Sequence, residues 1–202
     1  MSIQINELAN ALHNANCLKF GSFRIKSGAM SPYYIDLARL LSSPKDFEVI
    51  TKITAEKIKE ISKVEKIDKI ASIALKGALI SPSISALVNL PCVIIRKKKK
   101  EYGSKGRIVG AEVNKGDNIV FFDDVVSEGI SKIEGIEELR KEGAKVKHLI
   151  VVVDRQQGGK EKLEKRGFTV HSLAKISEII TYLAKTNKIK ENQAKKVLDY
   201  IK

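Results

Sequence analysis

The sequence lacks several features that define whole classes of protein. No apolar stretch approaches the roughly 20 residues that a helix needs to cross a bilayer, which argues against a membrane protein. The chain has only two cysteines, Cys17 and Cys92, and their positions fit no metal-ligand or redox motif. Its first residues lack the basic and then apolar layout of a secretion signal. Together these absences predict a soluble protein of the reducing cytoplasm.

Repeats and low-complexity segments are also missing, apart from the four lysines at 97–100. The formal net charge is +13, which would suit either nucleic acid or a small anionic substrate. Most of the lysines are scattered along segments with a helical pattern, so an ordinary solvated surface explains much of this charge. Charge alone leaves both kinds of partner open, and the local clusters of residues must decide between them.

The apolar pattern predicts one α/β domain. With 202 residues, of which 43% are hydrophobic and 30% charged, the chain can bury a sizeable core. We expect strands at 67–75, 91–97, 118–126, 146–154 and 168–173. Helices are expected after Gly77, Gly129 and Gly159, over about 3–18, from Pro44, and from about Ser177 and Glu191. Because strands that are apolar throughout are covered on both faces, this alternation predicts a parallel sheet flanked by helices.

The N-terminal part departs from this alternation. FGSFRIKSGAMSPYYIDLARLLSSP alternates apolar and polar residues and contains Ser-Gly and Ser-Pro turn signals, which is typical of short strands joined by tight turns. We therefore expect a single domain over residues 1–202, to which residues of about 1–43 contribute a small cap or hood.

The stretch NIVFFDDVVSEGISKIEG places two adjacent acids, Asp123 and Asp124, at the end of an apolar strand. In open α/β sheets, ligands gather at such ends. The backbone N–H groups around 126–130 and the positive end of the following helix dipole suit a phosphate. Two carboxylates would repel a phosphate unless they face hydroxyls or a cation, so a phosphorylated sugar fits both halves. The simpler alternative is an acid pair that only ends a strand and caps a helix.

The helix that follows the acids is well marked. Ile130, Ile133, Ile136 and Leu139 recur on one side of it, and Gly143 supplies a stop. This spacing predicts an amphipathic helix with these four side chains on its apolar side.

The acid turn resembles the ribose-phosphate motif of the type I phosphoribosyltransferases. Other segments, FGSFRIKSGAMSPYYIDL, IALKGALISPSISA, VIIRKKKKEYGSKGRIVGAEV and VVVDRQQGG, resemble the signature segments of orotate phosphoribosyltransferases in the right order, over about residues 17–160. The resemblance implies the type I phosphoribosyltransferase fold with its N-terminal hood. It also implies transfer of ribose 5-phosphate from phosphoribosyl diphosphate (PRPP) to orotate, which gives orotidine monophosphate and diphosphate in de novo UMP biosynthesis.

The resemblance also assigns residues to the site. It implies catalytic roles for Lys100, Asp123 and Asp124. The implied PRPP-binding residues are Lys26, Lys76, Arg96, Lys97, Lys100, Tyr102, Asp123, Asp124, Val125, Val126, Ser127, Glu128, Gly129, Ile130 and Ser131. The implied orotate-binding residues are Tyr33, Tyr34, Ser127 and Arg155. These residue types fit the chemistry, because a departing diphosphate needs converging cations and a planar carboxylate needs a guanidinium.

Two of the implied cations, Lys97 and Lys100, belong to a glycine-bearing loop, 97–110, that we interpret as mobile, and a third, Arg96, directly precedes it. Closure of such a loop would exclude water from an activated ribose. In this family the loop commonly reaches the neighbouring subunit, so a homodimer is implied. Magnesium is expected to arrive on the diphosphate and to be held by substrate oxygens and water, with no protein ligand. Neither a nucleic acid nor a membrane is expected as a partner.

The chain departs from the family pattern at a few positions. Ser-Glu-Gly-Ile-Ser stands where members often have Thr-Thr-Gly-Gly-Ser or Thr-Ala-Gly-Thr, which places an anion at Glu128 and a methyl-rich side chain at Ile130. We expect the 5′-phosphate to be held by the amides of 127–131 and by the two serine hydroxyls of that loop. Tyr102 replaces a histidine that many members carry, and Leu75 replaces an aromatic residue.

Two other functions stay open from the sequence alone. A purine or other-base phosphoribosyltransferase would keep the fold, but the Arg155 segment favours orotate because a neutral purine gives a guanidinium no charge to neutralise. A non-catalytic regulator of the same fold, which senses PRPP and binds nucleic acid, would suit the altered Ser-Glu-Gly-Ile loop and the charge of +13. The sequence shows no added DNA-binding segment and retains the loop cations, which favours the enzyme.

Overall fold

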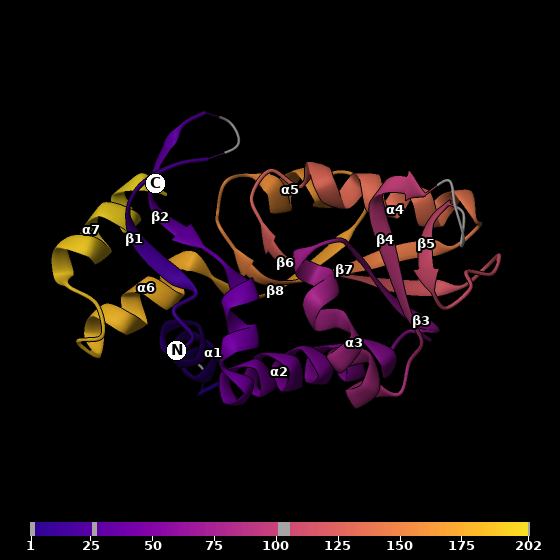
Figure 1. Cartoon of the computed structure of the whole chain (residues 1–202), viewed down its shortest axis with the longest axis horizontal. Coiled ribbons are helices and arrows are strands. Elements are labelled where there is room, and N and C mark those ends of the chain that lie inside the picture. Colours follow the sequence, from indigo (N-terminus) through magenta and orange to yellow (C-terminus); the bar gives the residue numbers. More distant parts are fainter. Residues whose placement is uncertain (1–2, 26–27, 101–105, 202) are drawn as a thin grey trace. The chain divides into compact units, whose positions relative to one another are not determined.

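The computed structural model describes residues 3–25, 28–100 and 106–201, with the backbone alone for residues 100 and 131. The chain divides into two compact units (Figure 1). The terminal unit contains Met1–Ile50 and Ala174–Lys202, and the central unit contains Thr51–Leu173. Each boundary falls inside an element: helix α2 (Pro44–Ser62) at one and strand β8 (Thr169–Lys175) at the other.

The central unit is built on a six-stranded sheet in the order β5-β4-β3-β6-β7-β8. Its other strands are β3 (Lys69–Ile73), β4 (Cys92–Lys100), β5 (Gly106–Gly110), β6 (Asn118–Val126) and β7 (Lys145–Asp154). Its other helices are α3 (Lys76–Val88), α4 (Ile130–Lys141) and α5 (Gly159–Glu164). Strands β4, β3, β6 and β7 are parallel to one another. The predicted fold class, a parallel sheet flanked by helices, is therefore confirmed.

One edge of the sheet differs from the prediction. β5 pairs with β4 in the antiparallel sense, with Gly110 opposite Val93. The expected loop over 97–110 is wrong in its bounds, because β4 runs to residue 100 and β5 begins at residue 106. A short connection of this kind can join two strands only in the antiparallel sense. Gly110 permits the close pairing, since its φ is +93° and a Cβ there would collide with the carbonyl oxygen of Cys92.

β3 is the strand at which the strand order reverses. The chain leaves β3 through α3 and enters β4 on one side, whereas β6 joins β3 on the other side. In open α/β sheets, ligands bind at the carboxyl ends of the strands beside such a topological switch point. In this sheet β3, β6 and β7 end at Ile73, Val126 and Asp154.

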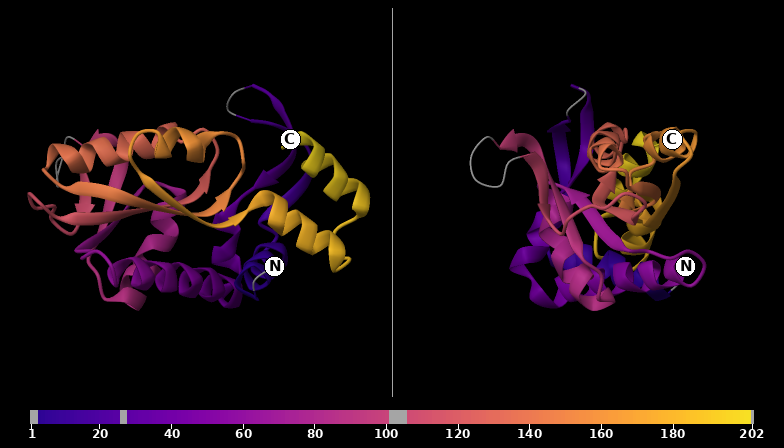
Figure 2. Two further views of the ribbon diagram at one scale, coloured as in Figure 1. Left: turned by 180° about the vertical axis from the view of Figure 1, so that it is seen from behind. Right: turned by 90° about the vertical axis from the view of Figure 1, so that its right-hand side faces the viewer.

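Helices cover both faces of this sheet (Figures 1 and 2). α4 and α5 lie on one face, where Ile136, Leu139 and Leu163 join a buried cluster that includes Phe121. α3 packs on β3 and β6 from the other face. Gly135 allows α4 to approach the sheet closely, because a Cβ there would lie 2.9 Å from the Phe121 ring. Among the residues that the structure describes, no helix is long and apolar enough to cross a membrane.

The terminal unit joins the two ends of the chain. It contains the antiparallel strands β1 (Leu18–Arg24) and β2 (Met30–Ile35), the 3₁₀-helix η1 (Leu37–Ser42), and helices α1 (Ile3–Asn14), α6 (Ile176–Lys185) and α7 (Glu191–Tyr200). α6 packs on α1, where the Asn10 amide donates a hydrogen bond to the Tyr182 hydroxyl at 3.0 Å, and α7 packs on β2. The two C-terminal helices thus lie in the same unit as the segment expected to form the cap. The single domain over residues 1–202 stays a prediction.

One segment of the terminal unit is helical where the sequence predicts strands and turns. Residues 37–42 form η1, which buries Leu37 and Leu40. These leucines are three residues apart, so one turn of a 3₁₀-helix places both on the same side. The alternating pattern that the sequence shows further upstream therefore ends at β2.

Gly135→Val tests the close packing of α4 on the sheet. The branched side chain would push α4 away from Phe121, and we expect the free energy of unfolding to fall by about 1–3 kcal/mol. Glu137→Val is the matched control, because residue 137 is exposed on the same helix and its change costs helix propensity of at most about 0.7 kcal/mol. Urea unfolding followed by circular dichroism measures both variants. Equal losses in the two would contradict this packing.

Candidate active site

β6 carries the two acids to the carboxyl edge of the sheet, beside the switch point. Asp123 and Asp124 are each only 6% exposed. Successive side chains of a strand point to opposite faces, so the two carboxylates meet different neighbours. A buried carboxylate is costly unless other groups satisfy it. The contacts of each acid therefore decide what the pair can do.

Asp123 has a partner on α4 that the sequence analysis did not identify. Its Oδ2 accepts a hydrogen bond from the Nζ of Lys132 at 2.6 Å, and both side chains are buried. Its Oδ1 accepts the backbone N–H of Asp124 at 2.9 Å. Both oxygens of Asp123 are thus fixed from within the protein.

Lys132 stands on α4 among buried apolar side chains. Ile130, which was expected on the apolar side of the helix, is 64% exposed, whereas Lys132 is 4% exposed. Lys132 lies four residues before Ile136 and seven before Leu139, so the three share one face, and both apolar residues are fully buried. The expected position of Ile130 is wrong. A lysine in register with these two buried positions is the signal that could have found the partner of Asp123.

Asp124 differs from its neighbour in having one oxygen without a partner. Its Oδ1 accepts the backbone N–H of Val125 at 2.8 Å. Its Oδ2 is buried and has no hydrogen-bond partner among the described residues. Burial and then the charge of Asp123 raise the pKa of Asp124 to about 7, while the charges of Lys132 and Lys76 oppose the rise. Asp124 therefore offers one buried acceptor to a ligand.

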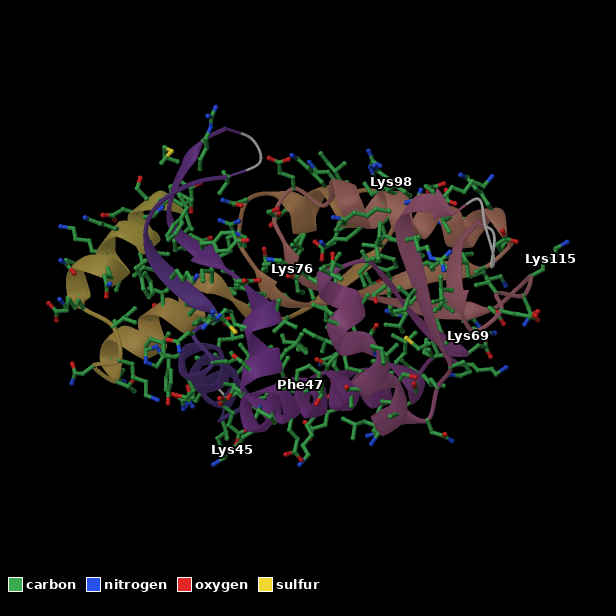
Figure 3. The ribbon with its side chains drawn as sticks, viewed as in Figure 1. Lys45, Phe47, Lys69, Lys76, Lys98 and Lys115 are labelled. Carbon is green, nitrogen blue, oxygen red and sulfur yellow. The ribbon has the colours of Figure 1, made fainter. Side chains whose placement is uncertain are left out.

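The N-terminal end of α3 lies against the acids. A Cβ at Gly77 would be 2.8 Å from the Oδ1 of Asp123 and 3.1 Å from the carbonyl oxygen of Phe122, so glycine is needed there. Lys76, the first residue of α3, is half-buried at this end of the helix (Figure 3). The preceding Leu75 is exposed, and its peptide bond to Ala74 is cis. The turn brings a cation to the edge that holds the acid pair.

The loop between β6 and α4 is held by α5. Gly129 has a φ of +81°, and a Cβ there would meet the side chain of Leu163 at 3.1 Å. Gly159 has no room for a Cβ either, because the carbonyl oxygen of Ser127 lies against it. Glu128, between these contacts, is exposed. Among the first N–H groups of α4, that of Lys132 donates to the carbonyl of Gly129 at 3.2 Å, and the two before it have no acceptor four residues earlier within the helix. The start of α4 can therefore donate hydrogen bonds to an anion.

β7 ends beside the same loop. Val126 of β6 stands opposite Asp154 of β7, and the N–H of Arg155 donates to the carbonyl of Val126 at 3.0 Å. The Oδ1 of Asp154 accepts the N–H of Gln156 at 2.8 Å, which shapes the turn after the strand. The backbone therefore places Arg155 next to the start of the loop that begins with Ser127.

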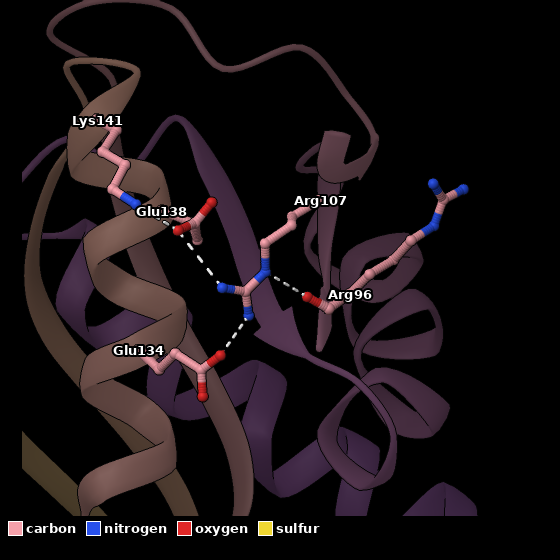
Figure 4. Close-up of polar contacts among 5 residues, drawn as sticks. All are labelled: Arg96, Arg107, Glu134, Glu138 and Lys141. Atoms are coloured by element: carbon pink, nitrogen blue, oxygen red, sulfur yellow. Dashed lines mark hydrogen bonds and ion pairs between the residues drawn. The ribbon is translucent and has the colours of Figure 1, made fainter. Parts of the chain in front are cut away.

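The edge ribbon of β4 and β5 is anchored to α4 by Arg107 (Figure 4). The Nε of Arg107 donates to the carbonyl of Arg96 at 2.7 Å. Its guanidinium also pairs with Glu134 at 2.6 Å and with Glu138 at 3.4 Å. The half-buried Arg96 points its own guanidinium away from this cluster. The ribbon is thus tied to the helix that supports the acid pair.

Several expected site residues cannot be placed at these strand ends. Lys26 and Tyr102 lie outside the described residues, as do the side chains of Lys100 and Ser131. Lys97 is exposed on β4. The roles that the resemblance implies for these residues stay predictions.

Tyr33 and Tyr34 belong to β2 in the terminal unit. Tyr33 is fully buried, with its ring edge-on to Tyr200 at a centroid distance of 6.2 Å. Tyr34 is exposed and lies 5.8 Å from the ring of Phe23. The contact of these tyrosines with a base stays a prediction, and Tyr34 is the one with an exposed ring to offer.

Comparisons with known proteins support one family. Residues 36–183 match the family model of the phosphoribosyl transferase domain. An orotate phosphoribosyltransferase of Pyrococcus horikoshii is 41% identical over 174 residues, which are 86% of this chain and 92% of that protein. The solved orotate phosphoribosyltransferase of Aeropyrum pernix has a TM-score of 0.76 and 27% identity, over 90% of this chain and 99% of that one. The UMP synthase of Leishmania donovani has a TM-score of 0.88 and 33% identity, over 99% of this chain.

The fold and the matching domain define a phosphoribosyltransferase, an enzyme that transfers a pentosyl group. Within that class, the chain belongs to the orotate phosphoribosyltransferase family. The resemblance noted in the sequence is therefore confirmed. The chain spans 42% of the length of the Leishmania UMP synthase and so corresponds to one part of that longer protein.

Asp124→Asn tests the burial of the acid pair. The pKa of Asp124 is about 7 in the folded chain and its ordinary value is 3.8, so between these pH values the unfolded chain releases a proton that the folded chain keeps. The free energy of unfolding of the wild-type chain therefore falls as the pH rises through this window. Asparagine does not ionise, so the variant should gain relative stability from pH ~4 to ~7 and no more above it. Urea unfolding at a series of pH values measures the difference, and a difference independent of pH would contradict the burial.

Proposed function

We propose that this chain transfers ribose 5-phosphate from PRPP to orotate, which gives orotidine monophosphate and diphosphate for UMP biosynthesis. The observation that carries the proposal is the buried Oδ2 of Asp124, an acceptor without a partner among the described residues, in a strand that leads into the N-terminus of α4. A ribose phosphate offers a hydroxyl to the acceptor and an anion to the helix end.

The ribose and 5′-phosphate of the donor fit the carboxyl end of β6. Asp124 accepts a hydrogen bond from a ribose hydroxyl, with Asp123 held beside it. The 5′-phosphate takes the backbone N–H groups of 127–131, where the helix dipole favours negative charge. Because Glu128 is exposed, its carboxylate can remain in water when the phosphate binds.

The diphosphate must leave with its charge stabilised, which requires cations near the bond that breaks. The position of Lys76 supports this role, because Lys76 stands at the start of α3 and its charge acts on Asp124. Arg96 and Lys97 follow on β4. We assign Lys26 and Lys100 to the same group because they match the family motifs, and Tyr102, which replaces a histidine, to the same binding segment as an uncharged hydrogen-bond donor.

Magnesium enters this proposal as part of the substrate. Phosphoribosyltransferases generally use magnesium with PRPP. The ion prefers phosphate oxygens and keeps several of its waters. A buried oxygen such as Asp124 Oδ2 suits a ribose hydroxyl better than a hydrated ion. The described residues thus fit an ion that the diphosphate and water hold.

Orotate needs a guanidinium for its carboxylate and a surface for its ring. Arg155 is half-buried at the end of β7, next to the 127–131 loop that binds the 5′-phosphate. Ser127 can bond to the ring from that loop, and the resemblance to the family adds Tyr33 and Tyr34 as residues that contact the base. We further propose a cytoplasmic homodimer in which the segment 97–110 of each subunit reaches the site of the other.

Loss of the ultraviolet absorbance of orotate, on mixing with magnesium and PRPP, tests this function. The wild-type chain should consume orotate, and Asp124→Asn should lower kcat/KM for PRPP about 10- to 100-fold, the effect of one charged hydrogen bond. Asp199→Asn, an exposed acid on α7, is the control and should match the wild type. No loss of orotate by a protein that still binds PRPP would mean that the acceptor is another base or that the chain is a sensor.

Arg155→Ala separates binding of orotate from binding of the donor. Removing the guanidinium should raise KM for orotate about 10- to 100-fold, because the carboxylate loses a charge-assisted pair. KM for PRPP should stay near the wild-type value. Arg166→Ala, an exposed arginine of the same unit, is the matched control. If KM for PRPP rises and KM for orotate does not, Arg155 serves the donor and its assignment fails.

A further inference from the structure

Lys132 is a buried cation to which the proposed reaction assigns no role. Its Nζ lies 2.6 Å from the Oδ2 of Asp123, with the two side chains 5% and 9% exposed. It stands in the first turn of α4, directly after the loop to which the proposed function assigns the 5′-phosphate. The ion pair therefore lies directly beside that loop.

The position is unfavourable for a lysine considered by itself. A cation at a helix N-terminus opposes the helix dipole. A buried ammonium loses its hydration, and a long side chain loses rotamer freedom when it is fixed. An apolar residue there would extend the buried face that Ile136 and Leu139 form. The compensation visible in the structure is the contact with Asp123.

α4 provides its own comparison. Lys141, at the other end of the helix, pairs with Glu138, also at 2.6 Å, but Lys141 is 68% exposed. Exposed pairs are screened by water and hold their side chains loosely. The two pairs have equal length and differ in burial, so only the Lys132 pair can fix a carboxylate firmly.

A chain of contacts leads from Lys132 to the open acceptor. Lys132 holds one oxygen of Asp123, and the other oxygen accepts the N–H of Asp124. Asp124 in turn uses its Oδ1 for the N–H of Val125, which leaves its Oδ2 for a ligand. The charges also match, since Lys132 and Lys76 balance the two acids. An anionic donor then meets a site whose carboxylates are already compensated.

We propose that Lys132 is a positioning residue that orients the Asp123 carboxylate and balances the charge of the acid pair, so that the pair can bind ribose hydroxyls beside a phosphate. This inference rests on the proposed function and deepens it. It also gives a physical reason why two acids can stand next to a phosphate-binding loop that carries a further anion at Glu128.

Calorimetric titration with magnesium and PRPP, in the absence of orotate, tests the inference. Lys132→Met keeps the length of the side chain and removes its charge, and we expect the dissociation constant for PRPP to rise at least about tenfold. Lys141→Met, the same change on the exposed pair, should leave it unchanged. In the absorbance assay, Lys132→Met should raise KM for PRPP and leave KM for orotate unchanged. If Lys132 served only to stabilise the fold, Lys132→Met would reduce the amount of folded protein and would not raise KM for PRPP alone.

Lys132→Gln covers the case in which the methionine variant does not fold, because glutamine keeps a hydrogen-bond donor for Asp123 without the charge. For this variant too, we expect the dissociation constant for PRPP to rise at least about tenfold. A Lys132 variant that is folded and binds PRPP as tightly as the wild type overturns the inference alone. A wild-type chain that binds PRPP but consumes no orotate overturns the proposed function, and the role of Lys132 in donor binding is still decided by the titration.

Discussion

The burial of two adjacent carboxylates at the end of β6 is the constraint on which the site depends. Each surrounding feature answers the cost of that burial. Lys132 and a backbone N–H take the oxygens of Asp123, and Lys76 adds a second compensating charge. One oxygen of Asp124 is left over, and the raised pKa of this acid reflects its burial and the charge beside it. One buried acceptor thus remains at the end of β6, and the proposed function assigns it to a ribose hydroxyl.

Close backbone contacts hold these groups in place. Gly77 lets the first turn of α3 lie against β6, and Gly159 lets α5 lie against the loop after the acids. The chain can then gather groups from β3, β6 and β7 at one edge of the sheet, as expected at a topological switch point. Any side chain at these two glycines would separate elements that the site needs together.

Much of the central unit could be predicted from the sequence, because its strands are apolar throughout and its helices begin at glycine-marked turns. The acids at the strand end and the arginine after β7 were also accessible, since their positions follow from strand bounds. Which residues of α4 are buried was not predicted in full. Ile130 is apolar but exposed, and Lys132 is charged but buried, because a carboxylate on another element satisfies it. The period of a helix can show that a charged residue is buried, but it does not show which residue of another element that charge meets. His148 and His171, whose ring nitrogens are 3.0 Å apart on β7 and β8, are a second example.

The central claim is that the acid pair and the following loop bind the ribose and phosphate of the donor. A crystal structure with ribose 5-phosphate bound tests this most directly. We predict a ribose hydroxyl within about 3 Å of Asp124 Oδ2 and the phosphate on the backbone N–H groups of 127–131. A sugar phosphate bound elsewhere, with the Oδ2 of Asp124 still without a partner, would contradict this reading of the site.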